Sequence, residues 1–357
     1  MALRPTKQFV KRAIWLAVTA VSVYLVVPSV IEVFSSWPEL ERLRSGSLAI
    51  MSVLMLLSLV CFWILLGLCL DSRKWSLMAM SQLASAAVAR IVPGGAATAT
   101  AVQYRLIRDA GVSTERAATG LTVVTVLNFA VLFSLPVFAA PALLFGPPIA
   151  SLLLRAAIVG IICFVAMAIA GGVFLLWDRP LILLGRAIDM IVRRFGRSDP
   201  EASPRADRLL EARDLLRANL ADQWFWVVLA SFGKWGFEYF ALVMAVRGVG
   251  HDDLSTILLL AFVTAALLSR IPFTPGGLGF VEAGLTGTLV MAGLSAGDAV
   301  LATLAFRLVS YWLPIPFGAL AYGLHRWQLH RRGVEIESFP EFGEQELDHP
   351  TTIEPAA

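Results

Sequence analysis

Long apolar runs separated by short charged segments dominate the sequence. Six of these runs reach the roughly 20 residues that a helix needs to cross the hydrocarbon core of a bilayer. They cover residues 13–33, 47–70, 117–140, 150–177, 223–246 and 299–327. The pattern predicts an all-α polytopic membrane protein with six spanning helices.

Two further apolar stretches, 75–108 and 254–293, are each interrupted in the middle by a Pro-Gly-Gly sequence. Proline removes a backbone donor and glycine weakens a helix, so such a break needs protein or water around it rather than lipid. We therefore expect two re-entrant helical hairpins. Their tips are Pro93, Gly94, Gly95, Pro275, Gly276 and Gly277. The alternative is that each Pro-Gly-Gly makes a tight turn in a purely structural bundle.

The two breaks belong to a longer repeat with an offset of 182 residues, from Pro93 to Pro275. With the same offset Gly111 matches Gly293, Ser113 matches Ser295 and Ala117 matches Ala299. The expected repeats cover about 47–140 and 223–327, and the number of intervening spans gives them opposite orientations. Inverted repeats with broken helices are typical of secondary transporters.

Lysine and arginine positions predict the orientation. Most of them lie before the first run, around the first broken stretch, between 178 and 222, or after the last run, and the positive-inside rule places these segments in the cytoplasm. Both termini are then cytoplasmic, in a bacterial-type inner membrane. A single membrane domain covers 1–332, segment 178–222 is an amphipathic connector at the membrane surface, and the acidic tail 333–357 is expected to be disordered.

Composition supports this picture, with 58% hydrophobic residues, 15% charged residues and a mean hydropathy of +0.75. A net charge of +3 without a contiguous basic patch gives no indication of nucleic-acid binding. Cys61, Cys69 and Cys163 lie within apolar runs, and no histidine has a partner at metal-ligand spacing. We therefore expect no metal site, no catalytic triad and no cofactor.

Ionisable residues within apolar segments are the candidate site, because placing a charge at the bilayer centre costs about 2.5 to 3.5 kcal/mol on insertion scales. They are Lys234, Glu238, Glu282, Arg307, Arg90, Arg270 and Arg105. Lys234 and Glu238 share a helix face and could neutralise each other, while Glu282 and Arg307 could form a structural ion pair. The functional alternative is that Arg307 binds a phosphate and a glutamate binds a cationic headgroup or carries a proton. The first half has Thr100 and Thr125 at the positions of Glu282 and Arg307.

The second half carries a recognisable sequence: Leu268-Ser269-Arg270-Ile271-Pro272, then Thr274-Pro275-Gly276-Gly277-Leu278-Gly279-Phe280-Val281-Glu282-Ala283, then Gly293 and Arg307. It resembles the membrane domain of bacterial lysylphosphatidylglycerol synthases, and the resemblance covers nearly the whole membrane part. The resemblance implies a translocase that moves an aminoacylated phospholipid across the inner membrane. In that family a soluble aminoacyl-transferase domain often follows, and none is recognised in this chain.

Three functions are compatible with the sequence. The leading hypothesis is a flippase-like translocase for a phospholipid or another lipid-linked substrate. The second is a membrane-embedded enzyme or accessory factor in lipid-linked sugar or isoprenoid metabolism, for which Asp252-Asp253 is the only compact acidic candidate. The third is a non-transporting scaffold for a separate lipid synthase. The sequence leaves the lipid and the oligomeric state open.

Overall fold

A computed structural model describes residues 40, 43–44, 46–91, 95–145, 151–194, 207, 210, 213–214, 222–252, 256–270 and 274–331. These residues form helices and connecting turns with no strand, so the all-α prediction is confirmed for the described part of the chain. The helices are α3 (Ser47–Cys69), α4 (Trp75–Ile91), α5 (Gly95–Asp109), α6 (Thr114–Phe145), α7 (Ser151–Leu176), α8 (Asp178–Arg194), α10 (Trp224–Gly248), α11 (Thr256–Leu268), α12 (Phe280–Met291), α13 (Ala296–Arg307) and α14 (Pro314–Arg331). Two short elements join some of them, the 3-10 turn η1 (Pro275–Gly277) and the π-helical turn η2 (Leu308–Trp312).

Four helices among the described residues are long and apolar enough to cross a membrane, at Ser47–Cys69, Thr114–Phe138, Trp224–Gly248 and Ala296–Leu324. A fifth candidate is the pair Ile158–Phe174 and Asp178–Ala187, whose two helices meet at 93°. The protein is therefore a multi-pass membrane protein. The first predicted span, 13–33, lies outside the described residues, so the count of six stays a prediction.

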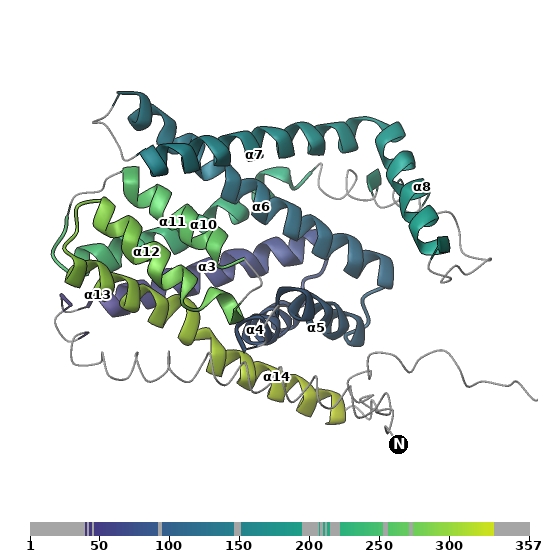
Figure 1. Ribbon diagram of the computed structural model, residues 1–357. Helices are drawn as coiled ribbons and strands as arrows, with labels where there is room; N and C mark the ends of the chain where they lie inside the picture. The colour runs from purple at the N-terminus through teal and green to yellow at the C-terminus, as the bar shows by residue number, and fades with distance from the viewer. Residues whose placement is uncertain are drawn as a thin grey trace, which may run out of the picture.

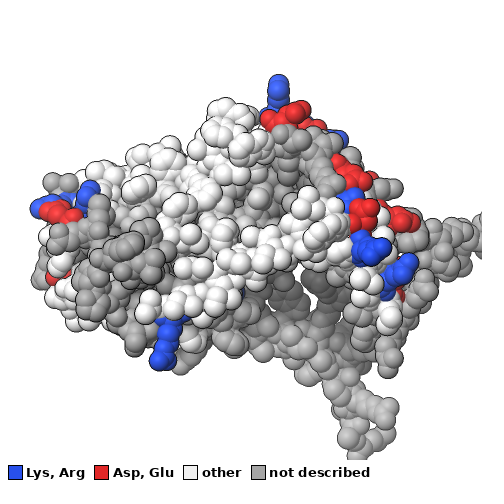
Figure 2. Space-filling view, turned by 90° about the horizontal axis from the view of Figure 1, so that it is seen from above, with Lys and Arg blue, Asp and Glu red and all other residues white. Residues whose placement is uncertain are grey.

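The molecular surface fits a lipid environment. Figure 2 shows acidic and basic side chains gathered toward two opposite ends of the molecule, with a mostly uncharged surface between them. Apolar side chains lie on this surface, including Val53 and Leu56 of α3, which are 57% and 58% exposed, and Ile162 of α7, which is 61% exposed. Aliphatic side chains exposed to this extent on long apolar helices are expected to face acyl chains.

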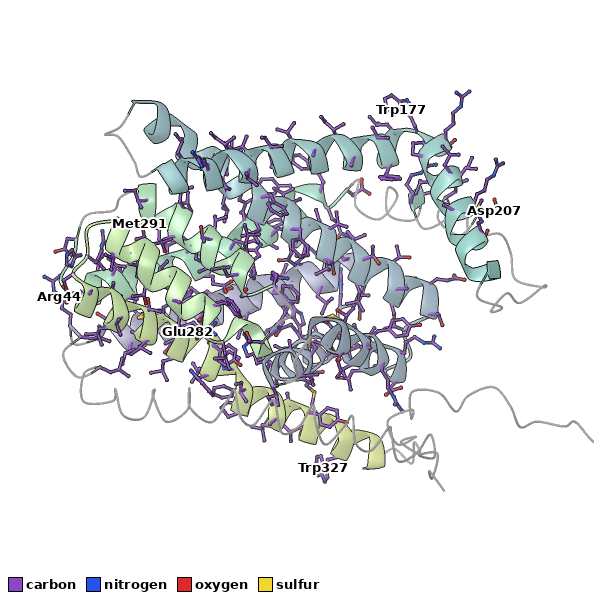
Figure 3. The ribbon with its side chains drawn as sticks, viewed as in Figure 1. Arg44, Trp177, Asp207, Glu282, Met291 and Trp327 are labelled. Atoms are coloured by element: carbon purple, nitrogen blue, oxygen red, sulfur yellow. The ribbon has the colours of Figure 1, made fainter. Side chains whose placement is uncertain are left out.

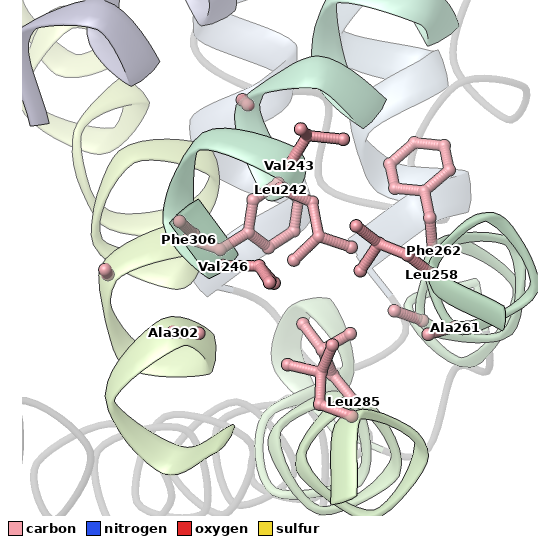
Figure 4. Close-up of a cluster of buried hydrophobic side chains, with 14 of the residues drawn as sticks. Leu242, Val243, Val246, Leu258, Ala261, Phe262, Leu285, Ala302 and Phe306 are labelled. Carbon is pink, nitrogen blue, oxygen red and sulfur yellow. The ribbon is translucent and has the colours of Figure 1, made fainter. Parts of the chain in front are cut away.

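The main hydrophobic core lies between α10 and the helices of the second half. Leu242 and Val246 of α10 meet Leu285 of α12 and Ala302 and Phe306 of α13, as Figure 4 shows. Leu242, Leu285 and Ala302 are fully buried. Because α3 packs along α10, this core also connects the first half of the chain to the second.

Helices α4 and α5 pack against each other, and α14 runs along α4 (Figure 1). The approach of α14 is close at Gly318, where an added Cβ would lie 2.3 Å from the backbone oxygen of Leu83. Helix α8 follows α7 and turns sharply away from it at the upper right of Figure 1, on the side of the molecule opposite α14. Its first residue, Asp178, forms an ion pair with Arg213, which also pairs with Asp214.

The turn from α5 to α6 and the turn from α12 to α13 have the same hydrogen bonds. In the first, Gly111 has a φ of 87° and the N–H of Val112 donates to the oxygen of Ile107. In the second, Gly293 has a φ of 103° and the N–H of Leu294 donates to the oxygen of Leu289. This is the Schellman pattern for ending a helix, in which glycine adopts the left-handed conformation. The matched positions of the sequence thus form matched local structures.

The second break requires its glycines. Gly276 and Gly277 have φ values of 55° and 74°, a region in which side chains are strained. An added Cβ on Gly276 would lie 2.3 Å from Cε2 of Tyr311, and one on Gly277 would lie 2.9 Å from Cα of Ser269. The break therefore packs directly on η2 and on the end of α11. At the first break, Pro93 and Gly94 lie outside the described residues, and Gly95 begins α5.

Candidate functional site

Six of the seven predicted ionisable residues lie near the helix breaks, on five different segments of the chain. They are Arg90 near the end of α4, Lys234 and Glu238 in α10, Arg270 just after α11, Glu282 in the first turn of α12, and Arg307 at the end of α13. Figure 3 places Glu282 between the end of the molecule that carries Arg44 and the end that carries Trp177 and Asp207. We refer to these six residues as the charge cluster.

Glu282 and Arg307 form an ion pair at the second break, with 2.6 Å between Nε of Arg307 and Oε1 of Glu282. The other carboxylate oxygen of Glu282 accepts a hydrogen bond of 2.7 Å from the N–H of Gly279, as a residue in the first helical turn commonly does. Nη2 of Arg307 lies 3.4 Å from the backbone oxygen of Gly276. The ion pair and this hydrogen bond therefore link the Pro-Gly-Gly turn and the start of α12 to the end of α13.

Lys234 and Glu238 form a second ion pair, on the inner side of α10, with 2.7 Å between Nζ and Oε2. Their side chains are only 14% and 23% exposed. The ammonium group of Lys234 also lies 3.0 Å from the ring centroid of Trp235, a cation–π contact. Trp235 is buried, and its Nε1 donates a hydrogen bond to the backbone oxygen of Asn128 in α6.

Arg90 and Arg270 differ from the other two cations, because neither forms an ion pair with a carboxylate within the part of the chain that the structure describes. Arg90 donates hydrogen bonds to the backbone oxygens of Ala86 (2.9 Å) and Ser310 (3.1 Å). The guanidinium of Arg270 lies 5.2 Å from the ring centroid of Phe129. The carboxylate of Glu238 acts electrostatically on both Arg90 and Arg270, and Arg270 acts more weakly on Arg90, so the three groups share one electrostatic environment.

Tyr311 is a site residue that the sequence did not reveal, because an aromatic residue in an apolar helix is more often a packing residue. Its hydroxyl donates a hydrogen bond of 2.6 Å to the backbone oxygen of Arg90, immediately before the first break. Its ring lies against Gly276 in the second break, and the guanidinium of Arg307 lies 4.3 Å from its centroid. The buried Tyr311 therefore touches the approaches to both breaks.

The backbone around Tyr311 is also unusual. It lies in the π-helical turn η2, where the N–H of Leu313 donates to the oxygen of Leu308, five residues earlier. Such turns inside α-helices frequently occur at functional sites. Pro314 begins α14, with one residue between it and the end of η2, and proline is a common cause of such a local change in helix geometry.

Arg105, the seventh predicted residue, has a different neighbour. Its Nε lies 4.0 Å from Oδ2 of Asp109, one turn further along α5. At the opposite end of the protein, Asp252 forms an exposed ion pair with Arg44, and Asp253 lies outside the described residues. Among the described residues, no three His, Cys, Asp or Glu side chains form a group that could hold a metal ion.

The chain matches a known family of membrane domains. The model of a family described as the lysylphosphatidylglycerol synthase TM region matches residues 7–318. The match includes every residue of the charge cluster. No solved structure matches the chain.

Two curated relatives are each named UPF0104 membrane protein and come from Methanothermobacter thermautotrophicus. One is 30% identical over 135 residues, which are 37% of this chain and 40% of the relative. The other is 30% identical over 91 residues, which are 26% of each protein. The chain thus matches less than half the length of either relative.

Proposed function

Because the chain belongs to the family of lysylphosphatidylglycerol synthase transmembrane regions, we propose that it is a flippase-like translocase that moves a lipid headgroup across the membrane. The charge cluster beside the helix breaks supports this function. Ionisable side chains within the membrane are costly and commonly mark a substrate pathway. In secondary transporters, broken helices surround the substrate site near the midplane.

The proposed architecture has six spanning helices and two re-entrant hairpins, α4–α5 and α11–η1–α12, arranged as an inverted repeat. The identical turns at Gly111 and Gly293 support the repeat. The packing of α4 on α5, of α11 on α12, and of the second break on α4 supports two hairpins whose tips approach each other. We place the protein in a bacterial-type inner membrane with cytoplasmic termini, where a separate synthase could supply the lipid.

The proposed mechanism is an exchange between two populated states. In the present state, Arg307 and Tyr311 connect the second break to α13 and to the end of α4. A headgroup that contacts the charge cluster would replace some of these bonds and let one hairpin move relative to the other. The lipid shifts the populations only through the difference in its free energy of binding to the two states.

Reconstitution into liposomes tests the activity. Wild type, Glu282→Gln and Arg307→Ala would be compared for transbilayer movement of acyl-labelled phospholipids, using only protein that elutes as a single folded species. We expect movement above the protein-free background for wild type and a clear loss in both variants. Equal rates in all three proteins, at background, would reject translocation, and equal rates above background would reject a role for the pair.

Cysteine accessibility tests the inverted repeat separately. Thr114→Cys and Ala296→Cys mark the equivalent first residues of α6 and α13, both exposed, in a background without the three native cysteines. An impermeant maleimide applied to sealed right-side-out vesicles should label only the cysteine at 296. Labelling of both positions, or of 114 alone, would contradict the proposed orientation.

A further inference from the structure

The charge cluster has unequal numbers of positive and negative groups. Arg90, Lys234, Arg270 and Arg307 are cations, whereas Glu238 and Glu282 are the carboxylates. Lys234 pairs with Glu238 and Arg307 pairs with Glu282, so each carboxylate already has a cation at 2.6 to 2.7 Å. The excess positive charge belongs to Arg90 and Arg270.

Hydrogen bonding does not remove this excess. Arg90 donates from Nη1 and Nη2 to the backbone oxygens of Ala86 and Ser310, which carry no net negative charge. Arg270 lies over the rings of Phe129 and Trp235, at 5.2 and 5.7 Å from their centroids, and ring faces offset only part of a full charge. The carboxylate of Glu238 attracts both arginines, but it already pairs with Lys234, and Arg90 also experiences the like charges of Arg307 and Arg270. An anion that binds both would lower the electrostatic free energy of the site.

We propose that Arg90 and Arg270 bind the phosphate of an anionic lipid whose headgroup has no compensating amine. The inference rests on the translocase proposal and specifies its substrate class. Guanidinium groups suit phosphate because their N–H groups can donate to two oxygens at once. We thus assign the phosphate-binding role that the sequence suggested for Arg307 to two arginines that form no ion pair with a carboxylate among the described residues.

The occupied carboxylates explain the preference against an amine. A cationic headgroup would have to displace Arg307 from Glu282 or Lys234 from Glu238, and one oxygen of Glu282 is also held by the N–H of Gly279. An anionic headgroup would displace neither pair. The same helix as Glu282 exposes apolar side chains, with Phe280 49% and Val290 43% exposed, so acyl chains can lie beside the site.

Native mass spectrometry of the detergent-solubilised protein tests binding independently of transport. The probes are phosphatidylglycerol, phosphatidic acid, phosphatidylethanolamine, lysyl-phosphatidylglycerol and diacylglycerol, and inorganic phosphate serves as the lipid-free anion. We expect retention of the two anionic lipids at least about tenfold above the two amine-bearing lipids and diacylglycerol. Retention of inorganic phosphate as strong as that of phosphatidic acid would identify a site for free phosphate and overturn the lipid assignment.

Two variants test the arginines: Arg270→Gln removes the charge of an exposed residue, and Arg90→Lys keeps the charge but removes the guanidinium. The control is Arg44→Gln, outside the charge cluster, where Arg44 forms an exposed ion pair with Asp252. Arg270→Gln should weaken binding of the anionic lipids about tenfold, Arg90→Lys less, and Arg44→Gln not at all. Unchanged lipid selectivity in Arg270→Gln, or stronger binding of lysyl-phosphatidylglycerol by wild type, would overturn the proposal. Selective binding without transbilayer movement would reject the translocase alone.

Discussion

The two broken segments, α4–α5 and α11–η1–α12, share a backbone plan but differ in how their side chains are used. Their exit turns at Gly111 and Gly293 have equivalent hydrogen bonds. The second segment then carries Glu282, which binds Arg307 of the following helix. The equivalent positions in the first half are Thr100 in α5 and Thr125 in α6, the helix that follows the first segment, and both are exposed. One half therefore has an internal ion pair where the other half presents small polar residues.

Local surroundings account for this difference. Arg307 is 5% exposed, and its position on α13 faces the second break, so its charge can be paired. Thr125 lies on the exposed side of α6, and its hydroxyl donates to the backbone oxygen of Leu121 in its own helix. A repeat can therefore preserve its helix ends while each half places charged residues according to the environment that each position faces.

The largest effect should follow from breaking the pair in the second half. Arg307→Ala leaves the carboxylate of Glu282 without its cation, and losing one partner of a buried pair costs about 3 to 5 kcal/mol. The melting temperature in detergent should fall strongly, whereas Glu282→Gln combined with Arg307→Met should recover much of the loss. Arg44→Ala is the control, because its pair with Asp252 is exposed and contributes about 1 kcal/mol or less. A similar melting temperature for Arg307→Ala and Arg44→Ala would contradict this ranking.

Placing the second half's charge in the first half should also be costly. Thr125→Arg would direct a guanidinium toward lipid from a spanning helix, at about 2.5 to 3.5 kcal/mol on insertion scales. We expect less protein in the membrane fraction and a lower melting temperature, while Thr125→Leu behaves like wild type. If Thr125→Arg is as stable as wild type, the side chain at position 125 faces a polar environment. The surroundings of positions 125 and 307 would then be more alike than the exposed fractions of Thr125 and Arg307 indicate.

The break itself should be less tolerant of a side chain than the helix beside it. Gly276→Ala adds a Cβ at a φ of 55°, 2.3 Å from the ring of Tyr311, and strain of this kind costs about 1 to 3 kcal/mol. Gly287→Ala in α12 is the matched control, since its Cβ would meet nothing within 4 Å. Thermal unfolding should show a loss for the first variant and no loss for the second. Equal behaviour would mean that the turn does not need the left-handed conformation.

Sequence patterns predicted the features that depend on local composition. The predicted run 47–70 corresponds to the helix Ser47–Cys69, and the helix is interrupted at Pro275–Gly277, as the Pro-Gly-Gly sequence predicted. The pairing of Lys234 with Glu238 follows from their spacing along one helix. The sequence also allowed an ion pair between Glu282 and Arg307, 25 positions apart, and the structure contains it. Contacts across the two halves of the chain could not be predicted from such patterns. The hydrogen bond from Arg90 to the backbone oxygen of Ser310 joins residues 220 positions apart. The contacts of Tyr311 with the approaches to both breaks likewise form only when the chain is folded.

The smallest expected effect concerns the link between the two broken segments. Tyr311→Phe keeps the ring that packs on Gly276 but removes the hydroxyl that donates to the backbone oxygen of Arg90. A single hydrogen bond contributes about 0.5 to 1.5 kcal/mol, so the melting temperature should fall only slightly. Transbilayer movement in liposomes should change more than stability does, because this bond is a direct contact between the approach to the first break and the turn that packs on the second. Ser231→Ala removes a buried hydroxyl that bonds only within α10, and it should reduce stability to a similar extent without altering movement. If both variants change movement equally, the hydroxyl of Tyr311 acts through stability alone and the two segments move independently of it.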